Sequence, residues 1–425
     1  MTAFIFLAVL LLLIALGMPI AFALLFSGVA VMFQMGQVDS QIVVQNAIGG
    51  ADNFVLMAVP FFILAGEFMN AGGLSRRIVE MAGAFVGHLR GGLGYVAIFA
   101  AILLASLSGS AVADTAALAA ILVPMMKQAG YDPARACGLM AAGGIIAPVI
   151  PPSIGFLLFG VVANVSITKL FLAGIAPGIM MGGALVVAWW LVSRRTSAQV
   201  SPRKPWSERL ALLGKGFWAL MMPVIIIGGL KFGIFTPTEA AVVAAAYAMF
   251  VGAVIYRELS LANIYHCLLV TARTTAVVLL LASLAMVASY MITIADVPGQ
   301  VGGWLSGLGE HPLALTAAMM LVIFLAGMVL DFIPIVLIFT PVFLPIAQAA
   351  GIDPVYFGVI FIINCSLGMI TPPVGVVLNV VSSIGKVTLG QAARGVMPFL
   401  LAELAVLVAL VLWPALVMVP AGWWR

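Results

Sequence analysis

Long stretches without a charged residue alternate with short polar segments along most of this chain. A run of about 18 or more apolar residues is long enough for a membrane-spanning helix. Backbone groups in lipid need partners within the chain, so these runs predict α-helices. The alternation of apolar and polar residues that is typical of a membrane β-barrel is absent. The runs are Met1–Val38, Ala136–Thr168, Leu170–Ser193, Thr274–Ala295, Pro312–Leu330, Phe332–Ile352, Pro354–Gly385 and Leu404–Trp424.

The chain repeats itself without a gap. Gly130-Tyr131-Asp132-Pro133 returns as Gly351-Ile352-Asp353-Pro354, and Pro151-Pro152 returns as Pro372-Pro373, so the offset is 372 − 151 = 221 residues. In a membrane protein, an internal repeat predicts a transporter built from two related halves, with its binding site where they meet. We therefore expect one repeat in residues 1–193 and the other in residues 216–425.

A basic segment, residues 194–215, separates the two halves. The segment contains a single acidic residue, Glu208, among its basic residues. Because short loops rich in Lys and Arg stay in the cytoplasm, we expect this linker to be cytoplasmic. If the halves are inverted, each crosses the membrane an odd number of times, which places both termini in the periplasm. The basic residues are Arg194, Arg195, Arg203, Lys204, Arg209 and Lys215.

Two apolar runs are too long for one ordinary span, and both contain a proline pair. Ala136–Thr168 holds Pro151-Pro152, and Pro354–Gly385 holds Pro372-Pro373. Proline lacks an N–H donor and disfavours helical backbone in the residue before it. Each run therefore predicts a broken helix, with unwound chain near residues 147–153 in the first half and 368–374 in the second.

A polar interruption precedes each broken helix. It falls at residues 106–110 in the first half and at 327–331 in the second, and the offset maps Ser110 onto Asp331 (331 − 110 = 221). An apolar, polar, apolar order predicts a re-entrant hairpin whose tip is buried in protein or lines a watery cavity. The fold class that follows is an all-α polytopic membrane protein with two inverted repeats, re-entrant hairpins and broken helices.

Unwound backbone leaves carbonyl oxygens without helical partners, and such oxygens suit a small hard cation such as Na⁺. The N-termini of the half-helices suit a carboxylate. We expect two cation sites with an organic anion between them. The first site is assigned to Ser108, Ser110 and the carbonyls near Ala147, Ile150 and Pro152, and the second to Gly327, Gly368, Thr371 and Val374. The residues expected to face the substrate are Ser110, Ser153, Asp331 and Thr371.

Each of these assignments has a plainer alternative. A serine in a membrane helix is usually a packing or local hydrogen-bonding residue. A charge at bilayer depth is costly, so Asp331 is functional by default, but it could also cap the next half-helix near the interface. For Asp114 and Glu67, capping or packing and a role in the site are equally open.

Composition limits the function classes further. Hydrophobic residues make up 64% of the chain and charged residues 8%, with a mean hydropathy of +1.27. Spans flank the basic segment on both sides, which argues against nucleic-acid binding. The three histidines, His88, His266 and His311, lie near span ends and form no catalytic cluster, so we expect no enzyme activity. The repeats also argue against a ring-lined channel pore.

Several stretches together resemble the large membrane subunit of TRAP transporters, the tripartite ATP-independent periplasmic carriers. The resemblance extends over nearly the whole chain, with one departure at Ala147, where the family often has glycine. The matching stretches are Pro60–Gly66, Met69–Ser75, Ser108–Asp114, Pro151–Ile154, Thr236–Ala240 and Thr371–Pro373.

The resemblance implies an ion-transporter superfamily fold in which a mobile transport domain moves against a scaffold, as in an elevator. It implies a Na⁺-driven importer of an organic acid in the bacterial inner membrane. It also implies two partners, a small four-helix membrane subunit, expected here as a separate chain, and a periplasmic substrate-binding protein. The alternative is a stand-alone cation-coupled carboxylate carrier or exchanger of the same superfamily, which would work without these accessory subunits.

Overall fold

The computed structural model describes residues 2–194, 202–304 and 311–423, and these residues form helices and short connections without any strand. Eight helical segments in the described ranges are long and apolar enough to cross a membrane. The shorter apolar helices include both halves of the second predicted broken helix and the second half of the first. The chain is therefore an all-α polytopic membrane protein.

The first half contains ten α-helices and one short 3-10 helix in the described residues. Five of these α-helices follow a residue whose side chain accepts a hydrogen bond from the helix's first turn: Asp39 before α3, Ser110 before α7, Asp132 before α8, Ser153 before α9 and Ser166 before α10. The elements are α1 (Thr2–Ala15), α2 (Ile20–Met35), α3 (Ser40–Ala51), η1 (Phe54–Met57), α4 (Ala58–Ala71), α5 (Leu74–Val86), α6 (Gly92–Ser108), α7 (Ala111–Gln128), α8 (Pro133–Gly144), α9 (Ile154–Ala163) and α10 (Ile167–Ser193).

The second half follows the same order. Asp331 caps α16 and Asp353 caps α17, as their counterparts Ser110 and Asp132 do in the first half. The elements are α11 (Trp206–Lys231), α12 (Pro237–Phe250), η2 (Val251–Ile255), α13 (Leu261–Ile294), α14 (Val297–Trp304), α15 (Pro312–Gly327), α16 (Phe332–Ala349), α17 (Pro354–Gly368), α18 (Val376–Gly385), α19 (Leu389–Leu412) and α20 (Ala415–Gly422).

Helix boundaries recur at the offset found in the sequence. Helix α7 runs from Ala111 to Gln128 and α16 from Phe332 to Ala349, so both ends differ by 221 (332 − 111 and 349 − 128). Both predicted broken helices are interrupted, between α8 and α9 and between α17 and α18. The peptide bond within each proline pair, Pro151-Pro152 and Pro372-Pro373, is cis.

The two halves differ in α13 and in its counterpart in the first half, which starts at Ser40. Helix α13 begins at Leu261 (261 − 40 = 221) and continues without a break to Ile294, whereas its counterpart is divided into α3 and α4. The division falls at Asp52 and Asn53, and the Asn53 side chain accepts a hydrogen bond from Val55 N at 2.9 Å. The run Met1–Val38 is also divided, into α1 and α2, at Gly17 and Pro19.

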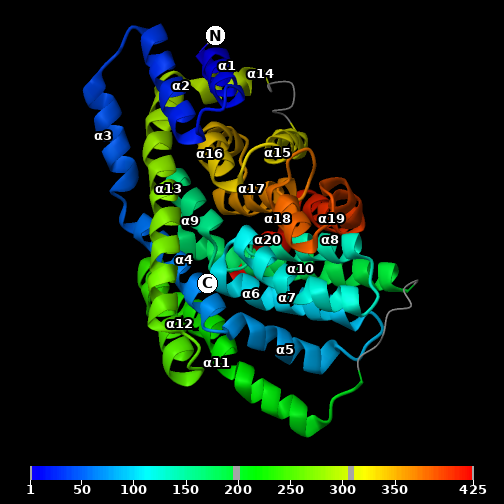
Figure 1. The fold of residues 1–425 in the computed structure, drawn as a ribbon. Coiled ribbons are helices and arrows are strands. Elements are labelled where there is room, and N and C mark those ends of the chain that lie inside the picture. The colour runs from blue at the N-terminus through cyan, green and yellow to red at the C-terminus, as the bar shows by residue number, and fades with distance from the viewer. Residues whose placement is uncertain (1, 195–201, 305–310, 424–425) are drawn as a thin grey trace.

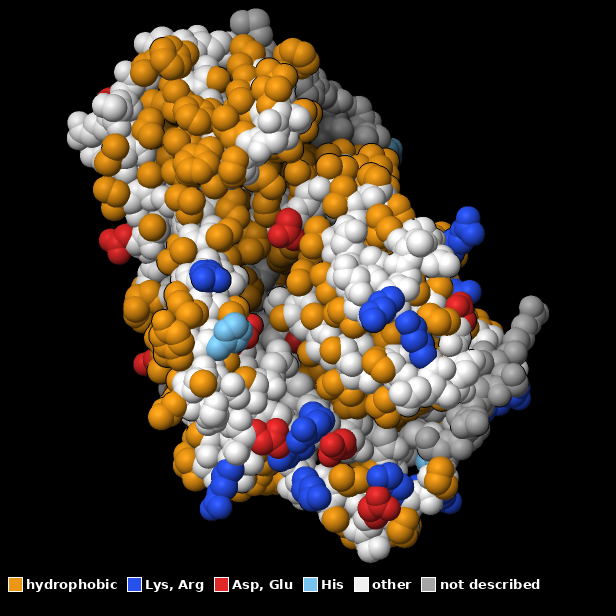
Figure 2. All heavy atoms as spheres, viewed as in Figure 1, with side chains coloured by type: hydrophobic (Ala, Val, Ile, Leu, Met, Phe, Trp, Pro, Cys, Tyr) orange, Lys and Arg blue, Asp and Glu red, His pale blue; other side chains and the backbone are white. Residues whose placement is uncertain are grey.

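The helices form two regions that lie side by side. The long helix α13 runs along one side of the molecule and packs against α2, α3 and α4, and α4 in turn packs against α12 (Figure 1). The hairpins α6–α7 and α15–α16 and the broken helices lie on the other side. Figure 2 shows a hollow between these two regions.

The basic segment 194–215 is not a loop throughout. Residues 195–201 lie outside the described residues, but residues 206–215 form the first turns of α11, so the linker between helices is shorter than predicted. Pro205 precedes this helix and Glu208 lies in its first turn, which are ordinary features of a helix start.

Candidate substrate and cation site

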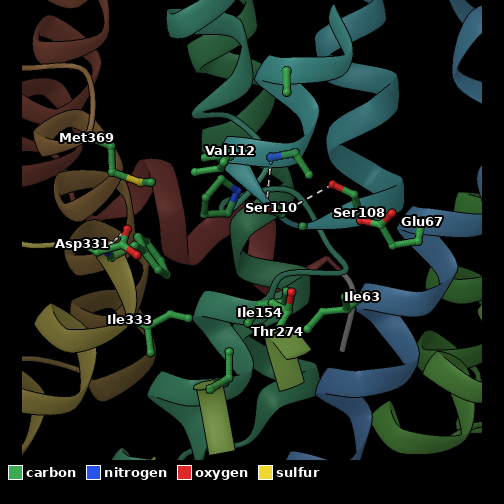
Figure 3. Close-up of a pocket in the computed structure, with 18 residues that line it drawn as sticks. Ile63, Glu67, Ser108, Ser110, Val112, Ile154, Thr274, Asp331, Ile333 and Met369 are labelled. Carbon is green, nitrogen blue, oxygen red and sulfur yellow. Dashed lines mark hydrogen bonds between the residues drawn. The ribbon is translucent and has the colours of Figure 1, made fainter. Parts of the chain in front are cut away.

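A cavity of about 360 Å³ opens where the two halves meet. Its lining includes residues from both hairpin tips and from both broken helices, and also from α4 and α13. In Figure 3, Asp331 and Met369 lie on one side and Ser108 and Glu67 on the other, with Ser110 between them. The lining residues used below are Ile63, Gly66, Glu67, Ser108, Ser110, Pro148, Thr274, Val278, Asp331 and Met369.

The tip of the first hairpin is a tight turn held by two serines. Gly109 ends α6 with a φ of 63°, a conformation that glycine adopts without strain. Ser110 begins α7, and its Oγ accepts a hydrogen bond from Ala113 N at 3.3 Å. The Ser108 Oγ accepts one from Ser110 N at 3.1 Å. The hydroxyl oxygens are therefore fixed at the edge of the cavity.

Behind this tip lies Asp114, whose side chain is buried. The Ser108 hydroxyl donates to Asp114 Oδ1 at 2.5 Å, and Asp114 Oδ2 has no hydrogen-bond partner within the described part of the chain. A buried carboxylate oxygen without a partner is costly unless a proton or a cation satisfies it. The Ser108 hydrogen bond ties Asp114 to the hairpin tip, and its two interpretations both stay open.

The first broken segment approaches this tip directly. A Cβ atom added to Gly109 would collide with the carbonyl oxygen of Pro152 and lie 3.1 Å from Ser153 Cα. The carbonyl oxygens of Ala147, Ile150 and Pro152 accept no hydrogen bond from the described residues. Of the residues predicted for the first cation site, Pro152 thus contacts the tip that carries Ser108 and Ser110.

Ser153 and Thr371, both predicted to face the substrate, are used within the chain. The Ser153 hydroxyl donates to Pro148 O at 2.5 Å and accepts from Phe156 N at 3.1 Å, so it caps α9. The Thr371 hydroxyl donates to Leu367 O at 2.8 Å. Neither residue belongs to the cavity lining.

The second tip meets the second broken segment in the same way. A Cβ atom added to Gly327 would lie 3.0 Å from Gly368 Cα, and Val374 N donates to Met328 O at 3.1 Å. The carbonyls of Gly327 and Thr371 accept no hydrogen bond from the described chain. Those of Gly368 and Val374 each accept one, which leaves a second lone pair on each oxygen.

Asp331 caps a helix and also lines the cavity. Its Oδ1 accepts a hydrogen bond from Phe332 N at 2.8 Å, so it caps α16, and its side chain also lines the cavity opposite Ser110 (Figure 3). Capping fixes the carboxylate in place, and its second oxygen remains available to a ligand.

The wall of the cavity opposite the hairpins was not predicted as part of the site, except that a site role was left open for Glu67. Ile63, Gly66 and Glu67 come from α4, and Thr274 and Val278 come from α13. Thr274 is one of few polar residues in the middle of α13. The apolar members carried no signal, since they resemble every other residue in such helices.

The electrostatics of the cavity combine helix ends with acids. The first residues of α7, α9 and α16 line it, so three helix N-termini open onto this space, and such ends attract anions. Glu67 and Asp331 are the charged residues among the lining, which contains no Lys or Arg from the described chain. This arrangement can hold an anion if cations are bound with it.

Comparisons with known protein families and curated proteins agree with the membrane architecture. Residues 7–416 match the family model described as tripartite ATP-independent periplasmic transporter, DctM component. The chain is 53% identical over 423 residues, covering 100% of both sequences, to the 2,3-diketo-L-gulonate TRAP transporter large permease protein YiaN of Escherichia coli strain K12. It is 38% identical to the sialic acid TRAP transporter large permease protein SiaM of Vibrio cholerae, covering 94% of this chain and 93% of the relative.

Among solved structures, the fold is similar to that of the Alcanivorax borkumensis YdaH transporter. The TM-score is 0.65 at 18% identity, with 88% of this chain and 87% of the other covered. At this identity, the similarity supports the fold and carries nothing about substrate.

Proposed function

The chain belongs to the tripartite ATP-independent periplasmic transporter family as its DctM component, the large permease subunit, and we propose that it uses a Na⁺ gradient to drive the import of an organic acid. The acid is delivered by a periplasmic binding protein, and a small membrane subunit packs beside this chain. The family assignment makes this chain a permease of a multi-pass membrane system rather than an enzyme.

The observation that supports the proposal most is the cavity between the two hairpin tips. Three helix N-termini favour a carboxylate there, while Ser108, Ser110 and the free carbonyls behind each tip are oxygen ligands for a cation. An anion without a bound cation would face Glu67 and Asp331 unshielded. Binding both together removes this repulsion, which is the physical basis of symport.

The first substrate to test is a sugar acid. The relative with 53% identity is named for 2,3-diketo-L-gulonate, and other relatives are named for sialic acid, C4-dicarboxylates and isethionate. All four names describe organic acids. The polar side chains at the cavity edge, Ser110, Thr274 and Asp331, suit a hydroxylated acid, because each can hydrogen-bond a hydroxyl group.

We propose an elevator motion between the two regions of the fold. The hairpins and broken helices hold the oxygen ligands, whereas α4 and α13 provide the opposite wall of the cavity. Moving the first region against the second would carry both tips across the membrane with their ligands. In this scheme, both termini are periplasmic and the linker between α10 and α11 is cytoplasmic.

The test is uptake into proteoliposomes that contain this chain and its small subunit, with the binding protein outside. We expect uptake of 2,3-diketo-L-gulonate or another sugar acid to require an inward Na⁺ gradient and to stop when K⁺ replaces Na⁺. Ser110→Ala removes a cavity hydroxyl, and we expect it to lower uptake at least tenfold. Ser27→Ala is the control, since this buried serine only donates to Ala23 O within α2.

Two outcomes would contradict the proposal. Equal uptake in Na⁺ and K⁺ would show that uptake is not coupled to a Na⁺ gradient. Uptake of free acid at the same rate without the binding protein would favour the stand-alone carrier.

A further inference from the structure

Arg209, in the second turn of α11, is a buried cation without an anion. Its side chain is 4% exposed, and its Nε and Nη2 atoms have no hydrogen-bond partner among the described residues. The Trp206 ring lies 5.2 Å from the guanidinium carbon, which gives a cation–π contact but no hydrogen-bond acceptor. Arginine does not lose its proton in proteins, so it cannot become neutral on burial. A buried charge in this position needs an anion from outside the described chain.

Helix α5, which packs against α11, is followed by a second polar atom without a partner among the described residues, the Nδ1 of His88. Helices α5 and α11 pack together, and a Cβ atom on Gly216 would lie 3.0 Å from Met81 Sδ. The two helices run in opposite directions, because Lys215 and Trp218 line a hollow with Arg76 and Arg77, at the start of α5. Arg209 is seven residues before Gly216, and His88, whose Nδ1 is buried without a partner, is seven residues after Met81.

Three other basic side chains at this end of the molecule pair with carboxylates. Arg76 and Arg77 donate to Glu258 at 2.7 and 2.8 Å, and Lys204 pairs with Glu208 at 2.6 Å. An anion arriving here therefore competes with carboxylates at those residues, but not at Arg209.

The surroundings of Arg209 indicate which anion this is. On the same helix, Trp206 is 65% exposed and Leu210 is 61% exposed, and Leu213 and Phe217 are exposed as well. Such a surface faces acyl chains, while Lys and Arg side chains gather at this end of the face drawn in Figure 2. Basic sites beside membrane helices bind the head groups of anionic lipids.

We propose that Arg209 binds the phosphate group of an anionic phospholipid, whose acyl chains lie along the exposed apolar side chains of α11. The guanidinium fork matches two phosphate oxygens, which a single ammonium group would not. The site lies where the linker between the two halves enters α11, apart from the transport cavity.

The test measures the thermal stability of the purified, delipidated chain as lipid is added back. The probes are phosphatidylglycerol, phosphatidylcholine and inorganic phosphate. We expect phosphatidylglycerol to raise the Tm of the wild-type protein in a concentration-dependent way. Arg209→Met should weaken this response about fivefold, the factor that one basic residue contributes to binding an anionic lipid. The control is Arg257→Met, because Arg257 is exposed in the loop after η2.

The same variant tests a second prediction, which would not hold if Arg209 had a purely structural role. Without lipid, Arg209→Met should be more stable than the wild-type protein, because it removes an unpaired buried charge and keeps an apolar side chain of similar length. If Arg209→Met does not fold, Arg209→Lys serves instead, which keeps the charge and loses the fork. Native mass spectrometry then counts the bound phosphatidylglycerol, and we expect fewer adducts on Arg209→Lys than on Arg257→Met.

Three results would overturn the proposal. The first is an equal phosphatidylglycerol response in Arg209→Met and the wild-type protein, or equal adduct counts on Arg209→Lys and Arg257→Met. The second is a delipidated Arg209→Met that is less stable than the wild-type protein. The third is a response to inorganic phosphate as large as the response to phosphatidylglycerol, which would indicate an anion site without a lipid.

Discussion

The contact between Gly327 and Gly368 brings the second hairpin tip against the second broken helix. A methyl group on Gly368 would lie 2.5 Å from Gly327 Cα and 2.6 Å from Gly327 C. Both of these are backbone atoms, which cannot turn aside as a flexible side chain can. We therefore expect Gly368→Ala to force α15 and α17 apart at the point where the second cation site is proposed.

The loss of stability that we expect from each substitution depends on how close the added methyl group lies to its neighbours. Inserting a methyl group into a packed interior costs about 1–3 kcal/mol, and we expect Gly368→Ala to fall near the upper end of this range. Gly327→Ala should cost less, because its methyl group would lie 3.0 Å from Gly368 Cα, the closest atom. Gly183, in α10, has nothing within 4 Å of an added methyl group. Gly183→Ala should be neutral or stabilise the helix by up to about 1 kcal/mol.

The assay combines the Tm of each purified variant with Na⁺-driven uptake in proteoliposomes. We expect Gly183→Ala to be the most stable variant, Gly327→Ala to be less stable and Gly368→Ala to be the least stable. We also expect uptake by Gly368→Ala to fall at least tenfold at a temperature where this variant stays folded. Full uptake by Gly368→Ala would refute the idea that this contact holds the second site together. A larger loss for Gly327→Ala than for Gly368→Ala would show that the spacing of the two glycines is not what limits the substitution.

Two further predictions concern buried carboxyl groups. Asp114→Asn keeps an acceptor for the Ser108 hydroxyl but removes the charge. We expect it to raise the Na⁺ concentration for half-maximal uptake at least tenfold. The control is Asp132→Asn, at the exposed start of α8, which should leave this concentration unchanged. An unchanged Na⁺ dependence in Asp114→Asn would exclude this residue from the cation site. Glu403, in α19, is fully buried, and neither carboxyl oxygen has a partner among the residues that the structure describes, so Glu403→Leu should raise the Tm and Glu403→Gln should raise it less. A Tm drop in Glu403→Leu similar to that of a core truncation would mean that this carboxyl group stabilises the fold.

The features of the fold that were predictable are those with a local chemical cause. Proline pairs interrupt helices wherever they occur, so both breaks were visible in the sequence. Ser110 and Asp331 stand directly before apolar runs, as residues that cap helices do, and the structure shows both as caps. The division between α3 and α4 also had a local cause in Asp52 and Asn53, but the polar pair lies outside the apolar runs and was not interpreted.

The features that were not predictable depend on packing between distant segments. Ile63 and Val278 line the cavity because α4 and α13 pack together, and nothing in the residues beside them distinguishes these two from lipid-facing positions. Ser153 illustrates the opposite problem. It was expected to face the substrate, and its hydroxyl donates to Pro148 O and accepts from Phe156 N, contacts that only the folded backbone reveals.

The charge of the cavity determines how tightly cation and acid binding must be coupled. Two like charges about 8 Å apart repel by roughly 2 kcal/mol at an effective dielectric constant of about 20. An incoming carboxylate would meet Glu67 and Asp331, a cost of about 4 kcal/mol, whereas three helix N-termini return about 1–3 kcal/mol. The difference must come from bound cations. Because such coupling is reciprocal, Na⁺ should raise the affinity for the acid by the same factor by which the acid raises the affinity for Na⁺. An acid affinity that is equal in Na⁺ and K⁺ would mean that these two carboxyl groups are not charged when the acid binds.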